Sequence, residues 1–154
     1  MRANSFSGET GKEIKGKHLG IIGFGSIGKK VARIASYGFN MRVHGFGRSS
    51  KKEIENRYRM PIDEFNHLFG LESYTNNIEE ILPKCDFVSC HLPLTEHTQG
   101  FFNKQLFSQF KKDAYFINTS RGGIVDEVAL NEVLGPGQIK GAALDVYNKE
   151  PYAP

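Results

Sequence analysis

The hydrophobic pattern of the chain begins with a short strand and continues with a helix. Residues 19–22 (LGII) lack polar side chains and form a run too short for a helix, as is typical of a buried parallel strand. The next apolar residues, Ile27, Val31, Ile34 and Ala35, recur at the spacing of one helix face. We therefore expect these four side chains to pack a helix back onto the sheet.

Strand and helix patterns alternate along the rest of the chain. Further strands are expected at residues 41–46, 71–74, 86–91, 114–118 and 139–146. Residues 53–69 are expected to be partly helical, and residues 77–82 to form a helix that Pro83 stops. This alternation predicts a single α/β domain, a Rossmann-type doubly wound parallel sheet over residues 16–154, after a polar lead-in at residues 1–15.

Two more helices are predicted by their amino-terminal caps. Asn103 and Asp126 are both followed by apolar residues at helical spacing, and Gly135 with Pro136 ends the second pattern. The apolar faces comprise Leu106, Phe107 and Phe110 in the first helix and Ala129, Leu130, Val133 and Leu134 in the second.

Three glycines lie between the first strand and its helix in the spacing Gly23-x-Gly25-x-x-Gly28. Between a strand and a helix, this spacing is typical of dinucleotide-binding sites. Gly23 would make the tight turn, Gly25 would let the backbone approach a pyrophosphate, and Gly28 would allow close packing of helix on strand. The helix N-terminus would face the phosphates, so we expect the chain to bind a dinucleotide.

The end of the second predicted strand indicates which dinucleotide is favoured. An acidic residue there would bind the ribose 2′-hydroxyl of NAD, but residues 47–52 read GRSSKK. The Arg48 guanidinium can bind a 2′-phosphate bidentately, and the Ser49 hydroxyl can donate to it. We expect NADP(H) to be favoured, with NAD(H) as the second cofactor. The alternative is a solvated basic loop without a ligand.

Length and composition limit the other function classes. A chain of 154 residues with 39% hydrophobic and 24% charged residues fits one domain with its own core. The net charge of +3 comes without a basic helix or a basic–aromatic pattern, so no nucleic-acid partner is expected. Nothing indicates a membrane partner. The amino terminus lacks an apolar signal segment and two cysteines give no disulfide framework, so a cytoplasmic, reducing compartment is expected.

Cys85, Cys90 and His91 lie close in the sequence, as metal ligands can. Residues five apart on one strand point to opposite faces of the sheet, so these side chains would not converge. No metal site is expected.

Ligands of open α/β sheets bind beyond the carboxyl ends of the strands, and three such ends carry candidate residues. Arg121 follows the predicted strand at residues 114–118, and two glycines after it allow a sharp turn. Asp145 lies near the end of the last strand, and Glu150 follows five residues later. Residues 91–93 (HLP) form an apolar corner suited to a flat ring. The alternatives are a surface salt bridge for Arg121 and an ordinary strand-end turn for Asp145 and Glu150.

Four segments that carry these residues resemble one enzyme family. They are GKHLGIIGFGSIG (16–28), HLPLTEHTQGFFN (91–103), FINTSRGGIVDEVAL (116–130) and GAALDVYNKEP (141–151). In this order they resemble the nucleotide-binding domain of the D-isomer-specific 2-hydroxyacid dehydrogenases, over about residues 11–151. The corner at residues 47–49 is most similar to that of the glyoxylate and hydroxypyruvate reductases, which favour NADPH.

The resemblance implies a role for each candidate residue. Arg121 would hold the carboxylate of a 2-keto or 2-hydroxy acid and polarise the ketone oxygen, and Glu150 would keep a catalytic histidine protonated. Asp145 would meet the nicotinamide carboxamide, and Ser26 and Ile27 would donate backbone groups to the pyrophosphate. The cofactor pocket would also be lined by Pro93, Thr98 and Thr119.

One part of the family pattern is not found in the sequence. The family's catalytic histidine follows the Glu-Pro pair by a few tens of residues, whereas the five histidines here all precede Glu150. His91 lies nearest the expected site, and we interpret it as hydrogen-bonded scaffold. We therefore expect the cofactor-binding part of an enzyme, without its substrate domain and inactive alone.

A second function class stays open at this point, because the same pattern occurs in corepressors that bind the dinucleotide as a sensor. The presence of both Arg121 and Glu150 favours the enzyme, and the basic corner at Arg48 argues against NAD(H) sensing. The resemblance also implies a homodimer.

Overall fold

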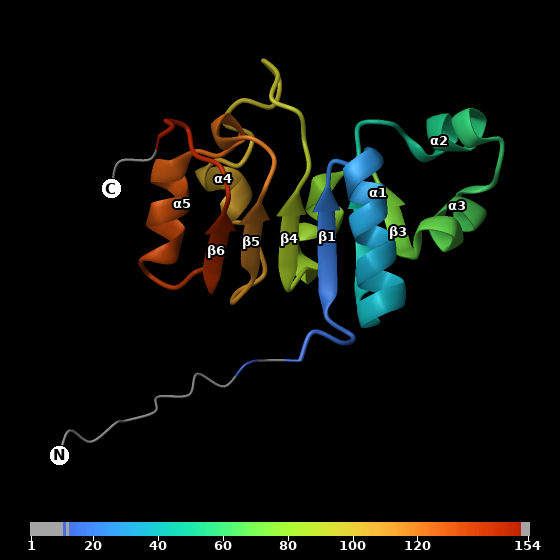
Figure 1. The fold of residues 1–154 in the computed structure, drawn as a ribbon, viewed down its shortest axis with the longest axis horizontal. Coiled ribbons are helices and arrows are strands. Elements are labelled where there is room, and N and C mark those ends of the chain that lie inside the picture. Colours follow the sequence, from blue (N-terminus) through green and yellow to red (C-terminus); the bar gives the residue numbers. More distant parts are fainter. Residues whose placement is uncertain (1–10, 12, 152–154) are drawn as a thin grey trace.

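The fold is a six-stranded parallel sheet in the computed structural model, which describes residue 11 and residues 13–151. The strands are β1 (His18–Ile22), β2 (Arg42–Phe46), β3 (Leu71–Thr75), β4 (Phe87–Cys90), β5 (Tyr115–Asn118) and β6 (Gly141–Leu144). Their order across the sheet is β3-β2-β1-β4-β5-β6 (Figure 1). This order confirms the predicted Rossmann-type sheet. Residues 1–10 and 12 of the predicted lead-in lie outside the described residues.

The carboxyl ends of the strands lie along one edge of the sheet, the upper edge in Figure 1. The strand order reverses at β1, where Leu19 pairs with Val43 of β2 on one side and Phe87 of β4 on the other. Ligands of this fold bind beyond the strand ends at such a switch point. The candidate site is therefore sought at this edge.

Helices cover both faces of the sheet. They are α1 (Ser26–Arg33), α2 (Lys51–Tyr58), α3 (Ile62–Phe69), α4 (Lys104–Phe107) and α5 (Glu127–Leu134), with a π-helical turn η1 (Ile34–Gly38) and the short 3-10 helices η2 (Ile78–Glu80), η3 (Leu82–Lys84) and η4 (Gly122–Ile124). Ile21 packs in one core cluster with Phe65 of α3, and Ile22 packs in the other with Leu130 of α5. The central strand is thus buried on both faces, which explains its unbroken apolar run.

The buried face of α1 differs from the prediction. Of the four residues expected there, only Ala35 is buried, and Ile27 and Ile34 are 64% and 60% exposed. Gly28 and Ala32 complete the buried face. A Cβ at Gly28 would lie 2.5 Å from a backbone oxygen of the preceding turn. The helix lies so close to the strand that only small side chains fit between them, and the prediction weighted apolar size instead.

The predicted helix at residues 77–82 is also wrong. Asn77 caps only η2, with its Oδ1 accepting from the Glu79 N–H at 3.2 Å, and η3 follows. Pro83 is the second residue of η3. Proline is tolerated at the start of a helix because the N–H it lacks would have no partner there, so Pro83 begins a turn instead of ending a helix.

The remaining strands and the two helix caps agree closely with the sequence, although α4 ends at Phe107 and Phe110 of its predicted apolar face lies beyond it. Apart from β6, which is two residues shorter at each end than residues 139–146, the strands differ from the prediction by at most one residue at either end. Asn103 Oδ1 accepts from the Leu106 N–H at 2.9 Å, and Asp126 Oδ1 accepts from the Val128 and Ala129 N–H groups at 3.0 and 3.1 Å. Both predicted caps are confirmed. None of the helices in the described residues has the length and apolar character needed to span a bilayer.

Candidate functional site

The glycine-rich turn joins the carboxyl end of β1 to α1. Gly23 has a φ of +103°, and a Cβ there would lie 2.6 Å from the backbone carbonyl carbon of His91. Only glycine fits this contact between the loops after β1 and β4. Gly25 has extended backbone (φ −84°, ψ −159°), and a Cβ there would meet nothing within 4 Å. The turn is tightly packed within the protein and leaves space at Gly25, which suits a dinucleotide cradle.

Ser26 and Ile27 are the first residues of α1 and follow this open position directly. The first amide groups of a helix lack acceptors within the helix, and together with the helix dipole they favour an anion. The two predicted pyrophosphate donors therefore lie at a helix N-terminus on the carboxyl edge of the sheet.

The loop after β2 is hydrogen-bonded by the side chains of Tyr74 and Arg57. The Tyr74 hydroxyl donates to the Ser49 carbonyl oxygen at 3.0 Å, and a Cβ at Gly47 would lie 2.6 Å from that hydroxyl. Arg57 of α2 donates from Nη2 to the Ser49 Oγ at 3.4 Å. Arg48 is exposed. The Ser49 hydroxyl thus lies beside one guanidinium and next in sequence to another.

An acidic residue also stands near this loop, at the start of α2. The Ser50 N–H and Oγ donate to Glu53 Oε2 at 2.7 and 2.8 Å, and the Glu53 N–H donates to the Ser50 Oγ at 3.3 Å. These hydrogen bonds form a capping box and lower the pKa of the Glu53 carboxyl. The carboxylate is therefore engaged by the helix cap.

Asn118, the last residue of β5, organises the loop that presents Arg121. Its side chain is fully buried, and its Oδ1 accepts from the Ser120 N–H and Oγ at 3.0 and 2.7 Å. Its Nδ2 donates to the Arg121 carbonyl oxygen at 3.0 Å. The Arg121 guanidinium is exposed and donates to the Ser120 carbonyl oxygen at 2.7 Å. Thr119 is an exposed residue of the same loop.

The loop after β6 touches the loop after β5. A Cβ at Gly122 would lie 2.0 Å from the backbone carbonyl of Tyr147, so only glycine permits this approach. Asn148 donates from Nδ2 to a backbone carbonyl of the β5 loop at 3.0 Å. Glu150 Oε1 accepts from the Tyr147 N–H at 3.0 Å. The loops that carry Arg121 and Glu150 are thus joined by direct main-chain contact.

Asp145 and the residues after β4 complete the carboxyl edge. The Asp145 N–H donates to the carbonyl oxygen of Asn118 at 3.0 Å, and its side chain is exposed. The Thr98 Oγ1 donates to the Pro93 carbonyl oxygen at 2.6 Å and accepts from the Thr95 N–H at 2.8 Å. The Thr98 hydroxyl therefore closes the loop that contains Pro93.

His91 is hydrogen-bonded within its own strand end. Its Nε2 lies 2.9 Å from the Ser89 Oγ, and burial lowers the pKa of its imidazole. A neutral, hydrogen-bonded imidazole agrees with its interpretation as scaffold.

Comparison with known proteins assigns this arrangement to a family. Residues 1–154 match the model of the D-isomer specific 2-hydroxyacid dehydrogenase, NAD binding domain. The chain belongs to this family. This confirms the resemblance from the four sequence segments, together with the expectation of a nicotinamide cofactor.

The relatives of this NAD-binding domain are longer proteins. The chain is 42% identical over 142 residues to human D-3-phosphoglycerate dehydrogenase and 40% identical over 142 residues to glyoxylate reductase from Thermococcus kodakarensis. Both alignments cover 92% of the chain but only 24% and 38% of the relatives. The chain thus spans about a quarter to two fifths of the length of these proteins.

Solved structures share the fold of this chain. D-mandelate dehydrogenase from Rhodotorula graminis superposes with a TM-score of 0.80 at 26% identity, over 93% of the chain and 38% of that protein. D-lactate dehydrogenase with NAD+ from Lactobacillus jensenii gives 0.73 at 30% identity, over 92% and 38%.

Three residues that hold the loops of the candidate site were not predicted from the sequence: Arg57, Tyr74 and Asn118. Tyr74 and Arg57 contact the loop after β2 from positions 25 and 8 residues away, which spacing alone does not reveal. Asn118 carried a signal, because a polar residue at the end of a buried strand needs partners nearby. The Ser50-x-x-Glu53 pattern could have located the start of α2, because it is the pattern of a capping box.

Proposed function

We propose that this NAD-binding domain serves an oxidoreductase that interconverts a D-2-hydroxy acid and a 2-keto acid such as glyoxylate or hydroxypyruvate. The observation that carries the proposal is the main-chain contact at Gly122, which joins the loops of Arg121 and Glu150. A bound nicotinamide supplies the hydride for the reduction. A small 2-keto or 2-hydroxy acid is the partner that this site fits.

In this proposal Arg121 acts on the substrate directly and Glu150 acts through a histidine. The planar guanidinium of Arg121 matches a carboxylate and can stabilise negative charge that develops on the ketone oxygen. The carboxylate of Glu150 raises the proton affinity of a histidine beside it, which then delivers a proton to the alkoxide oxygen.

The other candidate residues hold the cofactor in this proposal. Asp145 accepts from the nicotinamide carboxamide, and the backbone at Gly25, Ser26 and Ile27 binds the pyrophosphate. Gly23 and Gly28 shape the turn, and the pocket is lined by Pro93, Thr98 and Thr119.

We also propose that the cofactor is preferentially NADP(H), with weaker binding of NAD(H). Arg48 is exposed at the end of β2 and the Ser49 hydroxyl lies beside the Arg57 guanidinium. Two guanidinium groups and a hydroxyl suit a 2′-phosphate dianion. The Glu53 carboxylate, which would oppose such a charge, is engaged by Ser50.

The chain is expected to bind NADPH more tightly than NADH, and Arg48→Ala should remove most of the difference. Loss of one charge-assisted contact should weaken NADPH binding by about 1 to 3 kcal/mol and leave NADH nearly unchanged. Fluorescence titration of both cofactors at fixed ionic strength measures this. Arg33→Ala removes an exposed arginine at the far end of α1 and serves as the control. Equal affinity of the unsubstituted chain for the two cofactors would refute the NADP(H) proposal.

Arg57→Ala is expected to weaken NADPH binding less than Arg48→Ala, by roughly 1 kcal/mol, because its guanidinium reaches the phosphate from the side of Ser49 and stays partly solvated. Arg57→Lys should recover part of the loss, and NADH affinity should not change in either variant. Binding of 2′,5′-ADP and 5′-AMP isolates the contribution of the 2′-phosphate. An Arg57→Ala effect of equal size on both nucleotides would assign Arg57 to loop stability instead.

The corepressor alternative finds no support among the relatives named above, which are all dehydrogenases or reductases. The homodimer and the cytoplasmic compartment stay predictions. Sedimentation of the chain over a range of concentrations tests the first.

A further inference from the structure

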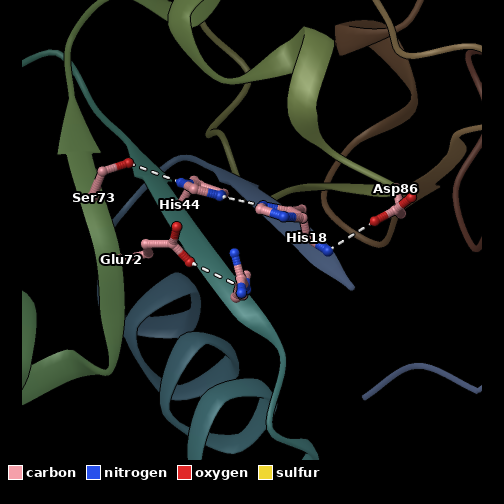
Figure 2. Close-up of polar contacts among 6 residues, drawn as sticks. His18, His44, Glu72, Ser73 and Asp86 are labelled. Carbon is pink, nitrogen blue, oxygen red and sulfur yellow. Dashed lines mark hydrogen bonds and ion pairs between the residues drawn. The ribbon is translucent and has the colours of Figure 1, made fainter. Parts of the chain in front are cut away.

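Two histidines and a glutamate from three neighbouring strands converge at a place that the proposed function does not use. His18 begins β1, His44 is the third residue of β2, and Glu72 is the second residue of β3 (Figure 2). One ligand atom from each side chain lies within 4.8 Å of the other two. The cofactor loops begin beyond the carboxyl ends of these strands, so this cluster is a separate feature.

The two imidazole rings face each other through nitrogen atoms. His18 Nδ1 lies 2.9 Å from His44 Nε2, and the ring planes are within 3° of parallel. The second nitrogen of His44, Nδ1, lies 2.8 Å from the Ser73 Oγ (Figure 2). The His18 main-chain N–H donates to Asp86 Oδ2 at 2.9 Å, which fixes the start of β1. The His44 ring is thus held between His18 and Ser73, and the backbone of His18 is held by Asp86.

We propose that His18 Nδ1, His44 Nε2 and the Glu72 carboxylate bind a divalent first-row transition metal ion, with Zn²⁺ as the best match. Imidazole nitrogen and carboxylate oxygen are ligands that Zn²⁺ prefers, and two histidines with one glutamate leave a fourth position for water. A proton on His44 Nδ1, donated to the Ser73 Oγ 2.8 Å away, would hold the tautomer that frees Nε2 for the metal.

Metal binding requires the facing nitrogens to separate slightly and both rings to turn until their lone pairs meet at the metal. Tetrahedral Zn²⁺ with Zn–N bonds of about 2.0–2.1 Å places two ligand nitrogens about 3.3 Å apart, slightly more than the present separation. The proton that His18 Nδ1 donates to His44 Nε2 in this tautomer moves to Nε2 of the His18 ring when the metal binds. The Glu72 side chain is 47% exposed and its contact with Arg42 is long, at 3.9 Å, so the carboxylate can swing toward the metal.

Some charged groups around the cluster favour a bound cation and others oppose it. Arg42 and Lys84 lie close enough to disfavour a cation, and Glu72 favours it. Asp86 is engaged by Lys111 and by the His18 N–H. The Glu72 carboxylate is therefore the group on which binding should depend most.

The test is titration of Zn²⁺ alone into the untagged 154-residue chain by isothermal titration calorimetry, repeated with Co²⁺ followed by its visible absorption. We expect one Zn²⁺ per chain, and Glu72→Gln and His18→Asn should each weaken it by at least about tenfold. His97→Asn, which removes an exposed histidine of the loop before α4, should leave the affinity unchanged. Glu72 is exposed, so Glu72→Gln keeps the test valid even if a histidine variant unfolds.

Two results would overturn the proposal. The first is the absence of saturable Zn²⁺ binding, which would make the histidine pair a structural hydrogen bond only. The second is binding that neither Glu72→Gln nor His18→Asn weakens, which would place the metal elsewhere on the chain.

Discussion

Expressed alone, the 154-residue chain is expected to bind cofactor and yet reduce glyoxylate or hydroxypyruvate about a hundred- to ten-thousand-fold more slowly than a full-length protein that contains this domain. That range is the usual contribution of a positioned general acid. Among the described residues, Glu150 makes no hydrogen bond to a histidine: it accepts from the Tyr147 N–H, His18 and His44 pair with each other, and His91 is hydrogen-bonded to Ser89. An open site also leaves the nicotinamide exposed to water. Stopped-flow absorbance of NADPH oxidation measures both rates.

Variants of the full-length protein separate the two site residues. Arg121→Ala should lower kcat and raise KM, because in the proposed function the guanidinium would contact the carboxylate in the ground state and the ketone oxygen in the transition state. Glu150→Gln should move the fall in rate at high pH to lower pH, because the histidine loses its proton more easily without the neighbouring carboxylate. Rapid turnover by the 154-residue chain that His91→Asn abolishes would show that His91 is the acid and that this assignment is wrong.

Gly25→Val is expected to fold normally and to lose binding of both NADPH and NADH by at least about 100-fold, because pyrophosphate contacts are charge-assisted hydrogen bonds worth about 1.5 to 3 kcal/mol each. The backbone at Gly25 has dihedral angles that valine adopts readily, and its Cβ would meet open space. The clash is therefore with the ligand and not with the protein. Titration calorimetry with each cofactor gives the loss, and circular dichroism monitors the fold.

Gly28→Val provides the contrasting control. Its Cβ would lie 2.5 Å from a backbone oxygen and 3.0 Å from the Ile21 side chain, so this variant should unfold or melt at a much lower temperature. Cofactor affinity that is unchanged in a folded Gly25→Val chain would refute the proposed approach of the pyrophosphate to this turn.

Much of the fold could be predicted from the sequence because, at most elements, the hydrophobic periodicity agrees with the capping and turn residues at the ends. The apolar run before Gly23 and the side-chain caps at Asn103 and Asp126 each have one local structure that satisfies them. The errors came where tertiary packing decided the outcome. Ile27 and Ile34 are exposed because only the small residues of α1 fit against the sheet, and helical periodicity does not report the distance between helix and strand.

The candidate site was predicted as a set of strand-end residues but not as an arrangement. Arg121 and Glu150 were found from their position after strands and from the family resemblance. The contact between the loops that carry them depends on Gly122 lying against Tyr147. These two residues are 25 positions apart, and no local pattern encodes their contact. The histidine cluster escaped for the same reason, since His18 and His44 are 26 residues apart and meet only when β1 pairs with β2.

The contact at Gly122 has a consequence for which substitutions the site can accept. It is made to backbone atoms of Tyr147, so the contact between the loops of Arg121 and Glu150 does not depend on the identity of the side chain at position 147. Under the proposed function, residues that select the variable end of a substrate could then be exchanged without disturbing the loops that carry Arg121 and Glu150. Relatives of the chain bear the names of enzymes for phosphoglycerate, glyoxylate, mandelate and lactate. Under the proposed function, a main-chain contact of this kind would allow one domain to serve such different molecules.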